Sequence, residues 1–414
     1  MNLELRKSTL KNRLPKITIT GSKSESNRLL LLQALYPEID ITNLSNSDDS
    51  QLMQKALCSN DEVIDIHHAG TAMRFLTAYF SVQPGREIVI TGSKRMKERP
   101  IRILVHALTE LGADIEYMEN TGFPPLKIKG KDFKGGQVTM NANVSSQYIS
   151  ALLLIAPKLK KGIELTLKGN ITSSPYILMT LRLLEEIGVN TSFKNNIIKV
   201  DSFDKKIDKR SLFVESDWSS ASYFYSIIAL SKVGTELELS YFKEHSLQGD
   251  SSLAKIYEGF GVQTEFRKDS IILTKINSID SDLIIELDLA NSPDIAQTIV
   301  VTCFGLGLEC KLTGLHTLKI KETDRLVSLK TELENLGGQV KITGDSLHLY
   351  KSSNIVKDVA ISTYNDHRMA MAFAPLALKT SLFIKDSNVV SKSYPDFWKD
   401  LESIGIDVIN INSL

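Results

Sequence analysis

The sequence predicts a mixed α/β (α+β) fold of two similar domains, each built from three repeated units. Two recurring patterns and one charged break carry this prediction. A small polar opening followed by about three turns of apolar residues recurs along the chain, and an amphipathic segment ending at glycine recurs between its copies. The break is residues 201–210, where seven of ten residues are charged, between the third and fourth units.

The apolar pattern has six copies, whose spacings are 45, 76, 74, 73 and 73 residues. These segments are apolar on nearly all sides, so we expect them to be buried helices. They begin at Ser24, Ala69, Ser145, Ser219, Ser292 and Asn365.

The second pattern predicts half-exposed helices, each followed by a β-like stretch. Glycine adopts the left-handed conformation that commonly ends a helix. The glycines are Gly112, Gly188, Gly261, Gly337 and Gly405. A degenerate copy at 48–60 is expected to end with Asn60 as its cap. Six units are too many for one core, so we expect three per domain; the charged break favours two globular halves over a solenoid.

Composition narrows the class of protein. The 414 residues include 49 basic and 49 acidic side chains, so the net charge is zero and nucleic acid is the least expected partner. No apolar run approaches membrane-spanning length and the first residues do not resemble a secretory signal, so we expect a cytoplasmic protein without membrane association. Cys58, Cys303 and Cys310 form neither a disulfide framework nor a CxxC metal motif.

Basic residues stand near the starts of the expected helices. A helix N-terminus carries partial positive charge, so a cation there is unfavourable by some tenths of a kcal/mol. Any one of them is more commonly solvated surface, but a set in corresponding places predicts a highly anionic ligand held between the two halves. The set is Lys23, Arg28, Arg74, Arg95, Lys321, Arg325, Arg368 and Lys392.

Polar side chains accompany these cations. Ser24, Ser145, Ser146, Gln147 and Ser173 could donate hydrogen bonds to an anion, although capping is the commonest role of serine at a helix start.

Carboxylates and histidines complete the candidate set. Asp294 and Glu322 lie among the cations and could be salt-bridge partners or proton-transfer groups. Asp217 is interpreted mainly as a helix cap. His67 and His68 are expected to pack locally, and His367 could be a cap partner or part of the site.

Ten motifs along the chain resemble the 5-enolpyruvylshikimate-3-phosphate (EPSP) synthase family and occur in that family's order. KETDR and NDHRMAM are the most specific of them. The motifs are GSKSESNR (21–28), HAGTAMR, RMKERP, SSQ, SSPY, SDWSSASYF, SPDIA, KETDR, YNDHRMAM and SKSYPDFW (391–398).

The resemblance implies two domains, each of three βαβαββ repeats around a pseudo-threefold axis, with the active site in the cleft between them. One domain would contain residues 1–20 and 215–414, and the other residues 21–214. The implied enzyme is a 3-phosphoshikimate 1-carboxyvinyltransferase of aromatic amino acid and chorismate biosynthesis. It transfers the enolpyruvyl group of phosphoenolpyruvate to the 5-hydroxyl of shikimate 3-phosphate and releases phosphate. No metal or cofactor is implied, and a monomer is expected.

The family's functional residues map onto matching motif positions. The resemblance implies that Asp294 accepts the hydroxyl proton and that Glu322 handles the methylene proton, with Lys23 sharing acid duty. The implied shikimate 3-phosphate ligands are Lys23, Ser24, Arg28, Ser145, Ser146, Gln147, Ser173, Tyr176, Asp294 and Lys321. Those for phosphoenolpyruvate are Lys23, Gly70, Arg95, Gln147, Arg325, Arg368 and Lys392.

Three positions depart from the commonest family pattern. His68 stands where asparagine is usual, Phe75 where proline is frequent, and Thr317 where some members have asparagine. The first two put sensitivity to inhibitors of the phosphoenolpyruvate pocket in question. Two other functions remain open. One is a UDP-N-acetylglucosamine enolpyruvyl transferase, which uses a loop cysteine that RMKERP lacks; the other is a non-catalytic anion-binding module.

Overall fold

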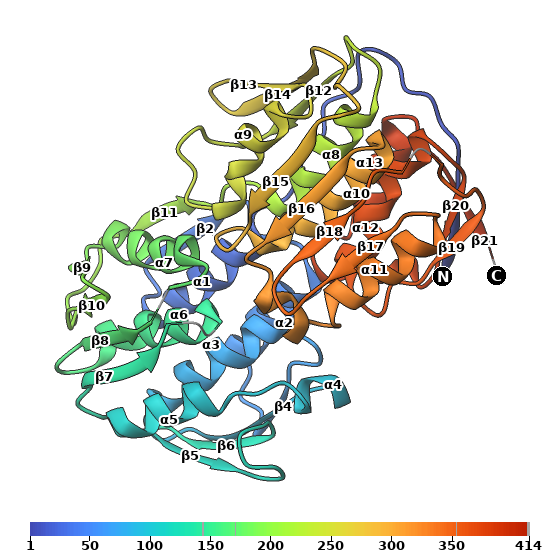
Figure 1. Ribbon diagram of the computed structural model, residues 1–414. Helices are drawn as coiled ribbons and strands as arrows, with labels where there is room; N and C mark the ends of the chain where they lie inside the picture. The colour runs from blue at the N-terminus through green and yellow to red at the C-terminus, as the bar shows by residue number, and fades with distance from the viewer. Residues whose placement is uncertain (143–144, 170, 353, 412–414) are drawn as a thin grey trace. The chain divides into compact units, whose positions relative to one another are not determined.

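The computed structural model describes residues 1–142, 145–169, 171–352 and 354–411. The chain divides into two compact units, which we call the N-terminal unit (Gly21–Val214) and the C-terminal unit (Met1–Thr20 with Glu215–Leu414). Both units combine helices with small sheets (Figure 1), which confirms the mixed α/β class. The charged segment 201–210 does not mark the end of a unit, because its last residue begins a strand that pairs within the N-terminal unit.

Two βαβαββ repeats make up most of the N-terminal unit. In each sheet the first two strands are parallel and a hairpin adds the other two, giving the orders β3-β4-β6-β5 and β7-β8-β10-β9. The first repeat contains β3 (Val63–Asp65), α3 (Gly70–Ser81), β4 (Glu87–Thr91), α4 (Lys94–Lys97), α5 (Arg102–Leu111), β5 (Asp114–Tyr117) and β6 (Leu126–Lys129). The second contains β7 (Gly136–Asn141), α6 (Ser146–Ile155), β8 (Ile163–Lys168), α7 (Ser174–Glu186), β9 (Thr191–Lys194) and β10 (Ile197–Val200).

The third repeat of this unit is shorter and comes from both ends of its sequence. It contains α1 (Lys23–Leu35), β2 (Ile39–Thr42) and α2 (Asp48–Cys58), and β11 (Arg210–Phe213) lies parallel to β2.

The C-terminal unit follows the same plan, but the N-terminal segment of the chain completes two of its sheets. In Figure 1 the blue strand β1 (Asn2–Arg6) lies between two red strands, and it pairs antiparallel with both. That repeat also contains β19 (Val359–Ile361), α12 (His367–Phe373), β20 (Leu382–Ile384), α13 (Phe397–Ser403) and β21 (Asp407–Ile411).

Residues 13–17 begin another repeat, since Arg13 and Ile17 form parallel bridges to Glu236 and Leu239. It continues with α8 (Trp218–Leu230), β12 (Glu236–Ser240), η2 (Gly249–Ser252), α9 (Leu253–Glu258), β13 (Val262–Phe266) and β14 (Ser270–Lys275). The remaining repeat contains β15 (Ile284–Asp288), η3 (Pro293–Ile295), α10 (Ala296–Leu306), β16 (Glu309–Thr313), η4 (His316–Ile320), α11 (Arg325–Asn335), β17 (Val340–Ile342) and β18 (Leu347–Leu349).

The two helix types behave as the sequence predicts. The apolar helices, such as α6, α8 and α10, are buried almost throughout, whereas α5 and α11 bury one face. All five expected glycines have positive φ, from 69° at Gly261 to 116° at Gly112. The prediction for Asn60 is wrong: α2 ends at Cys58, and its cap Ser59 is already extended because the chain continues directly toward β3. No helix in the described part of the chain is both long and apolar enough to cross a membrane.

Candidate functional site

Each unit gathers a group of the expected site residues at the starts of its helices. In the N-terminal unit, Lys23 is the first residue of α1, whose N-cap is Ser22. The Lys23 ammonium lies 3.6 Å from an Asp49 carboxylate oxygen, and His68 Nε2 lies 4.0 Å from the other oxygen. Asp49 therefore offsets the unfavourable interaction of a cation with the helix N-terminus.

Arg28 is the most informative cation of this group, because it is 3% exposed. Its guanidinium donates to Thr180 Oγ1 at 2.8 Å, to Ser150 Oγ at 2.9 Å and to the Ser24 carbonyl at 2.7 Å. In the described residues, its hydrogen bonds go to hydroxyl and carbonyl oxygens and to no carboxylate. Burial lowers its pKa to about 10. The hydrogen bonds of this buried charge go only to neutral groups, and the charge of Glu25 offsets only part of the cost of burial, so an anionic ligand would complete this environment.

The starts of α6 and α7 present polar groups beside Arg28's partners. Ser145 caps α6 and accepts from the Gln147 N–H, and the Gln147 side chain donates to Thr71 Oγ1 at 3.1 Å. Ser146 is the first residue of that helix. Ser173 caps α7 with a left-handed φ of 55°, and its hydroxyl does not bond to the helix.

The aromatic ring of Tyr176 lies near Arg28, with 5.9 Å between the ring centroid and the guanidinium carbon. The ring centroid of Phe75 lies 5.4 Å from the same guanidinium carbon. The ring faces therefore favour the charged form of Arg28.

The structure brings Arg99, and not Arg95, to Gly70. A Cβ atom on Gly70 would lie 2.4 Å from Arg99 Nη1, so only glycine allows this approach. Arg99 is 9% exposed, and its Nε has no hydrogen-bond partner among the described residues. Arg95 lies on the exposed side of α4 and pairs with Glu98 at 3.2 Å. The apolar Met96 is the signal that could have identified Arg99 from the sequence. Met96 is buried, and Arg99 follows it by three residues and donates its backbone N–H to the Met96 carbonyl.

Arg74 has a structural environment within the same unit. Its guanidinium donates to the backbone carbonyls of Gly70 at 3.0 Å and Pro100 at 3.1 Å. It therefore joins the start of α3 to the RMKERP segment.

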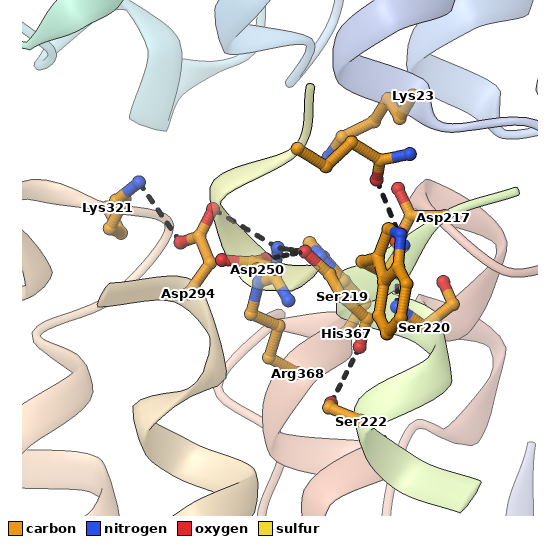
Figure 2. Close-up of polar contacts among 12 residues, drawn as sticks. Lys23, Asp217, Ser219, Ser220, Ser222, Asp250, Asp294, Lys321, His367 and Arg368 are labelled. Carbon is orange, nitrogen blue, oxygen red and sulfur yellow. Dashed lines mark hydrogen bonds and ion pairs between the residues drawn. The ribbon is translucent and has the colours of Figure 1, made fainter. Parts of the chain in front are cut away.

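In the C-terminal unit, Asp294 contacts three cations. Figure 2 shows two of them, Lys321 and Arg368, and the third is Arg325. One carboxylate oxygen lies 3.3 Å from Lys321 Nζ and 3.0 Å from Arg325 Nη1, and the other lies 3.2 Å from Arg368 Nη2. Burial lowers the pKa of Lys321, an effect that Asp294 opposes.

Arg325 is the buried anchor of this group and is 1% exposed. It contacts Glu322 at 2.9 Å and Asp366 at 2.6 Å in addition to Asp294. Burial opposes its charge, but the three carboxylates more than compensate and raise its pKa above the usual value. Asp366 also caps α12 by accepting the Arg368 N–H. Lys392 donates to the Asn365 carbonyl at 2.5 Å.

The remaining expectations have simpler outcomes. Asp217 caps α8 by accepting the Ser220 N–H at 2.7 Å, which confirms its interpretation. Thr317 lies on η4, and its hydroxyl has no hydrogen-bond partner in the described ranges. His367 is 2% exposed, and its Nδ1 lies 4.0 Å from Asp366.

Sequence analysis missed Asp250, which bonds to Ser219 beside Arg368. In the sequence, Asp250 is not part of a recurring pattern of charged residues, so no signal pointed to it. In the described segments, no group of three or more His, Cys, Asp or Glu side chains is arranged to hold a metal ion.

Comparison with known proteins gives one consistent family. The model of the EPSP synthase (3-phosphoshikimate 1-carboxyvinyltransferase) family matches residues 54–401. A 3-phosphoshikimate 1-carboxyvinyltransferase from Bacteroides fragilis is 48% identical over 397 residues, covering 95% of each chain. One from Buchnera aphidicola is 36% identical over 419 residues, covering 94% of each.

The fold is also similar to that of a solved structure. The EPSP synthase from Acinetobacter baumannii has a TM-score of 0.79 at 20% identity, covering 99% of this chain and all of its own. This likeness supports the fold, while the family match and the 48% identical relative establish the family. The chain belongs to the EPSP synthase family of 3-phosphoshikimate 1-carboxyvinyltransferases.

Proposed function

We propose that this chain catalyses the reaction for which its family is named. The enolpyruvyl group of phosphoenolpyruvate would pass to the 5-hydroxyl of shikimate 3-phosphate, and inorganic phosphate would leave. The observation that carries the proposal is Asp294 held among Lys321, Arg325 and Arg368. Pure anion binding would gain nothing from a carboxylate there, whereas proton transfer requires one.

The residues have distinct proposed tasks. Asp294 accepts the hydroxyl proton as the oxygen attacks C2 of phosphoenolpyruvate, and Glu322 or Lys23 delivers a proton to the methylene carbon. The tetrahedral intermediate then loses phosphate and one methyl proton. The cations beside Asp294, which are Lys321, Arg325 and Arg368, would balance the charge that develops in this reaction.

Arg28 and its neighbours are the proposed shikimate 3-phosphate ligands in the N-terminal unit. The Arg28 guanidinium is buried, and within the described ranges its hydrogen bonds go to neutral groups alone, which supports this assignment. The other proposed ligands of this substrate are Lys23, Ser24, Ser145, Ser146, Gln147, Ser173, Tyr176, Asp294 and Lys321.

For phosphoenolpyruvate, the geometry supports Arg99 in place of Arg95. The Arg99 guanidinium lies against Gly70 with little exposure, while Arg95 is half exposed and paired with Glu98. The other proposed ligands are Lys23, Gln147, Arg325, Arg368 and Lys392.

The test is phosphate release from phosphoenolpyruvate in three reactions: with shikimate 3-phosphate, with UDP-N-acetylglucosamine, and without an acceptor. We expect release with shikimate 3-phosphate alone. Release with the sugar nucleotide would support the other enolpyruvyl transferase, and no release with either would leave an anion-binding module. Asp294→Asn is the matched control for contaminating phosphatase, because it should abolish nearly all genuine release.

A further inference from the structure

Asp250 is a buried carboxylate with few partners. It lies on η2 and is 3% exposed. One oxygen accepts the Ser219 hydroxyl proton, and the other has no hydrogen-bond partner within the described residues. A buried carboxylate with one donor is unfavourable, so its presence beside the candidate site needs a physical reason.

The reason lies in the direction of the Ser219 hydrogen bonds. A hydroxyl has one proton, and Ser219 donates it to Asp250. Its oxygen must therefore accept, and it accepts from Arg368 Nη2 at 3.2 Å. The same nitrogen contacts Asp294 at 3.2 Å, so its two N–H groups have defined partners. Figure 2 shows this series of contacts, which runs from Asp250 through Ser219 and Arg368 to Asp294.

Charge links the same groups. Burial raises the pKa of Asp250 to about 7, and the negative charges of Asp294 and Asp217 add to that effect. The Arg368 guanidinium and the Ser219 hydrogen bond oppose it. The ionisation of Asp250 is therefore sensitive to the residues proposed to bind and activate substrate.

We propose that Asp250 is a positioning residue for phosphoenolpyruvate: it makes Ser219 an obligatory acceptor and so fixes the orientation of the Arg368 guanidinium. The inference rests on the proposed function, in which Arg368 holds that substrate. Asp250 itself touches neither substrate in this scheme.

The test is a double-mutant cycle with the full-length enzyme. Asp250→Ala and Ser219→Ala should each raise KM for phosphoenolpyruvate about tenfold, the scale of one hydrogen bond to a charged group, while kcat changes less than about threefold. Because Asp250 acts through Ser219, the double variant should be no worse than Ser219→Ala alone. Asp250→Asn retains an acceptor oxygen and should restore KM to within about threefold of wild type.

Ser226→Ala is the matched control. Ser226 is a second serine of α8; it is buried and accepts a hydrogen bond from Thr302 of α10, so the KM of Ser226→Ala for phosphoenolpyruvate should stay at the wild-type value. Independent, multiplying effects of Asp250→Ala and Ser219→Ala would overturn the inference, as would an unchanged KM in Asp250→Ala. If the wild-type enzyme is active and either of these two results is found, only this inference is refuted. If the wild-type enzyme is inactive, the proposed function is refuted and the inference with it.

Discussion

The raised pKa of Asp250 predicts a pH dependence of folding stability. Its usual value is 3.8, and burial, with the charge of Asp294, raises it to about 7. Between these values the folded protein keeps a proton that the unfolded chain releases. The contribution of Asp250 to the free energy of unfolding is therefore fully present below about pH 4 and is lost as pH rises toward 7.

The magnitude follows from the size of the shift. About three pKa units at about 1.36 kcal/mol each give an upper limit near 4 kcal/mol. Asp250→Asn stays uncharged, so the free energy of unfolding of the variant minus that of wild type should increase by up to this amount between pH 4 and pH 8. Taking the difference removes the titration of the groups that the two proteins share.

Urea denaturation of both proteins at pH 4, 6 and 8 provides the measurement. Asp282→Asn is the control, because Asp282 is exposed and its pKa is lowered by a hydrogen bond from Lys351. For Asp282→Asn, the free energy of unfolding of the variant minus that of wild type should change little between pH 4 and pH 8, and it should decrease where that of Asp250→Asn increases. A difference between wild type and Asp250→Asn that stays constant across this range would refute the reasoning.

Three further predictions test individual residues. Asp294→Asn removes the proposed base and should lower kcat by roughly two to four orders of magnitude in steady-state assays, with less effect on shikimate 3-phosphate affinity; a kcat near wild type would return Asp294 to a salt-bridge role. Arg99→Ala should raise KM for phosphoenolpyruvate at least about tenfold, whereas Arg95→Ala should leave it nearly unchanged. A larger effect of Arg95→Ala than of Arg99→Ala would contradict the assignment of Arg99, in place of Arg95, as a phosphoenolpyruvate ligand. Arg325→Met leaves the carboxylate of Asp366 buried without its partner and should lower the free energy of unfolding by about 3–5 kcal/mol in chemical denaturation; a loss below about 1 kcal/mol would contradict this buried network.

Much of the fold could be predicted from sequence because its signals are local. A helix that is apolar on all sides must be buried, and glycines such as Gly112 and Gly405 stand where left-handed φ ends a helix. Periodicity could not show that β1 lies between β20 and β21, since that pairing joins the two ends of the chain. The charged segment 201–210 also misled, because its charges belong to a surface segment of the N-terminal unit.

The candidate site was less predictable because it depends on tertiary contacts. Both arginines of RMKERP carry the same charge, and tertiary contacts distinguish them: Arg99 is buried against Gly70, whereas Arg95 is exposed and pairs with Glu98. Asp250 becomes visible only when η2 meets the start of α8 at Ser219. Motif spacing can identify the residue types of a site, but it cannot show which of them are already occupied by other residues.

One phosphorus NMR experiment tests the central claim most directly. Phosphoenolpyruvate and shikimate 3-phosphate are mixed in equal amounts with the enzyme, and every phosphorus resonance is followed over time. We expect the phosphoenolpyruvate signal to be replaced by inorganic phosphate, while the shikimate 3-phosphate signal is replaced one for one by that of a new phosphate monoester. Formation of inorganic phosphate with the shikimate 3-phosphate resonance unchanged, or no change in any resonance, would contradict enolpyruvyl transfer by this protein.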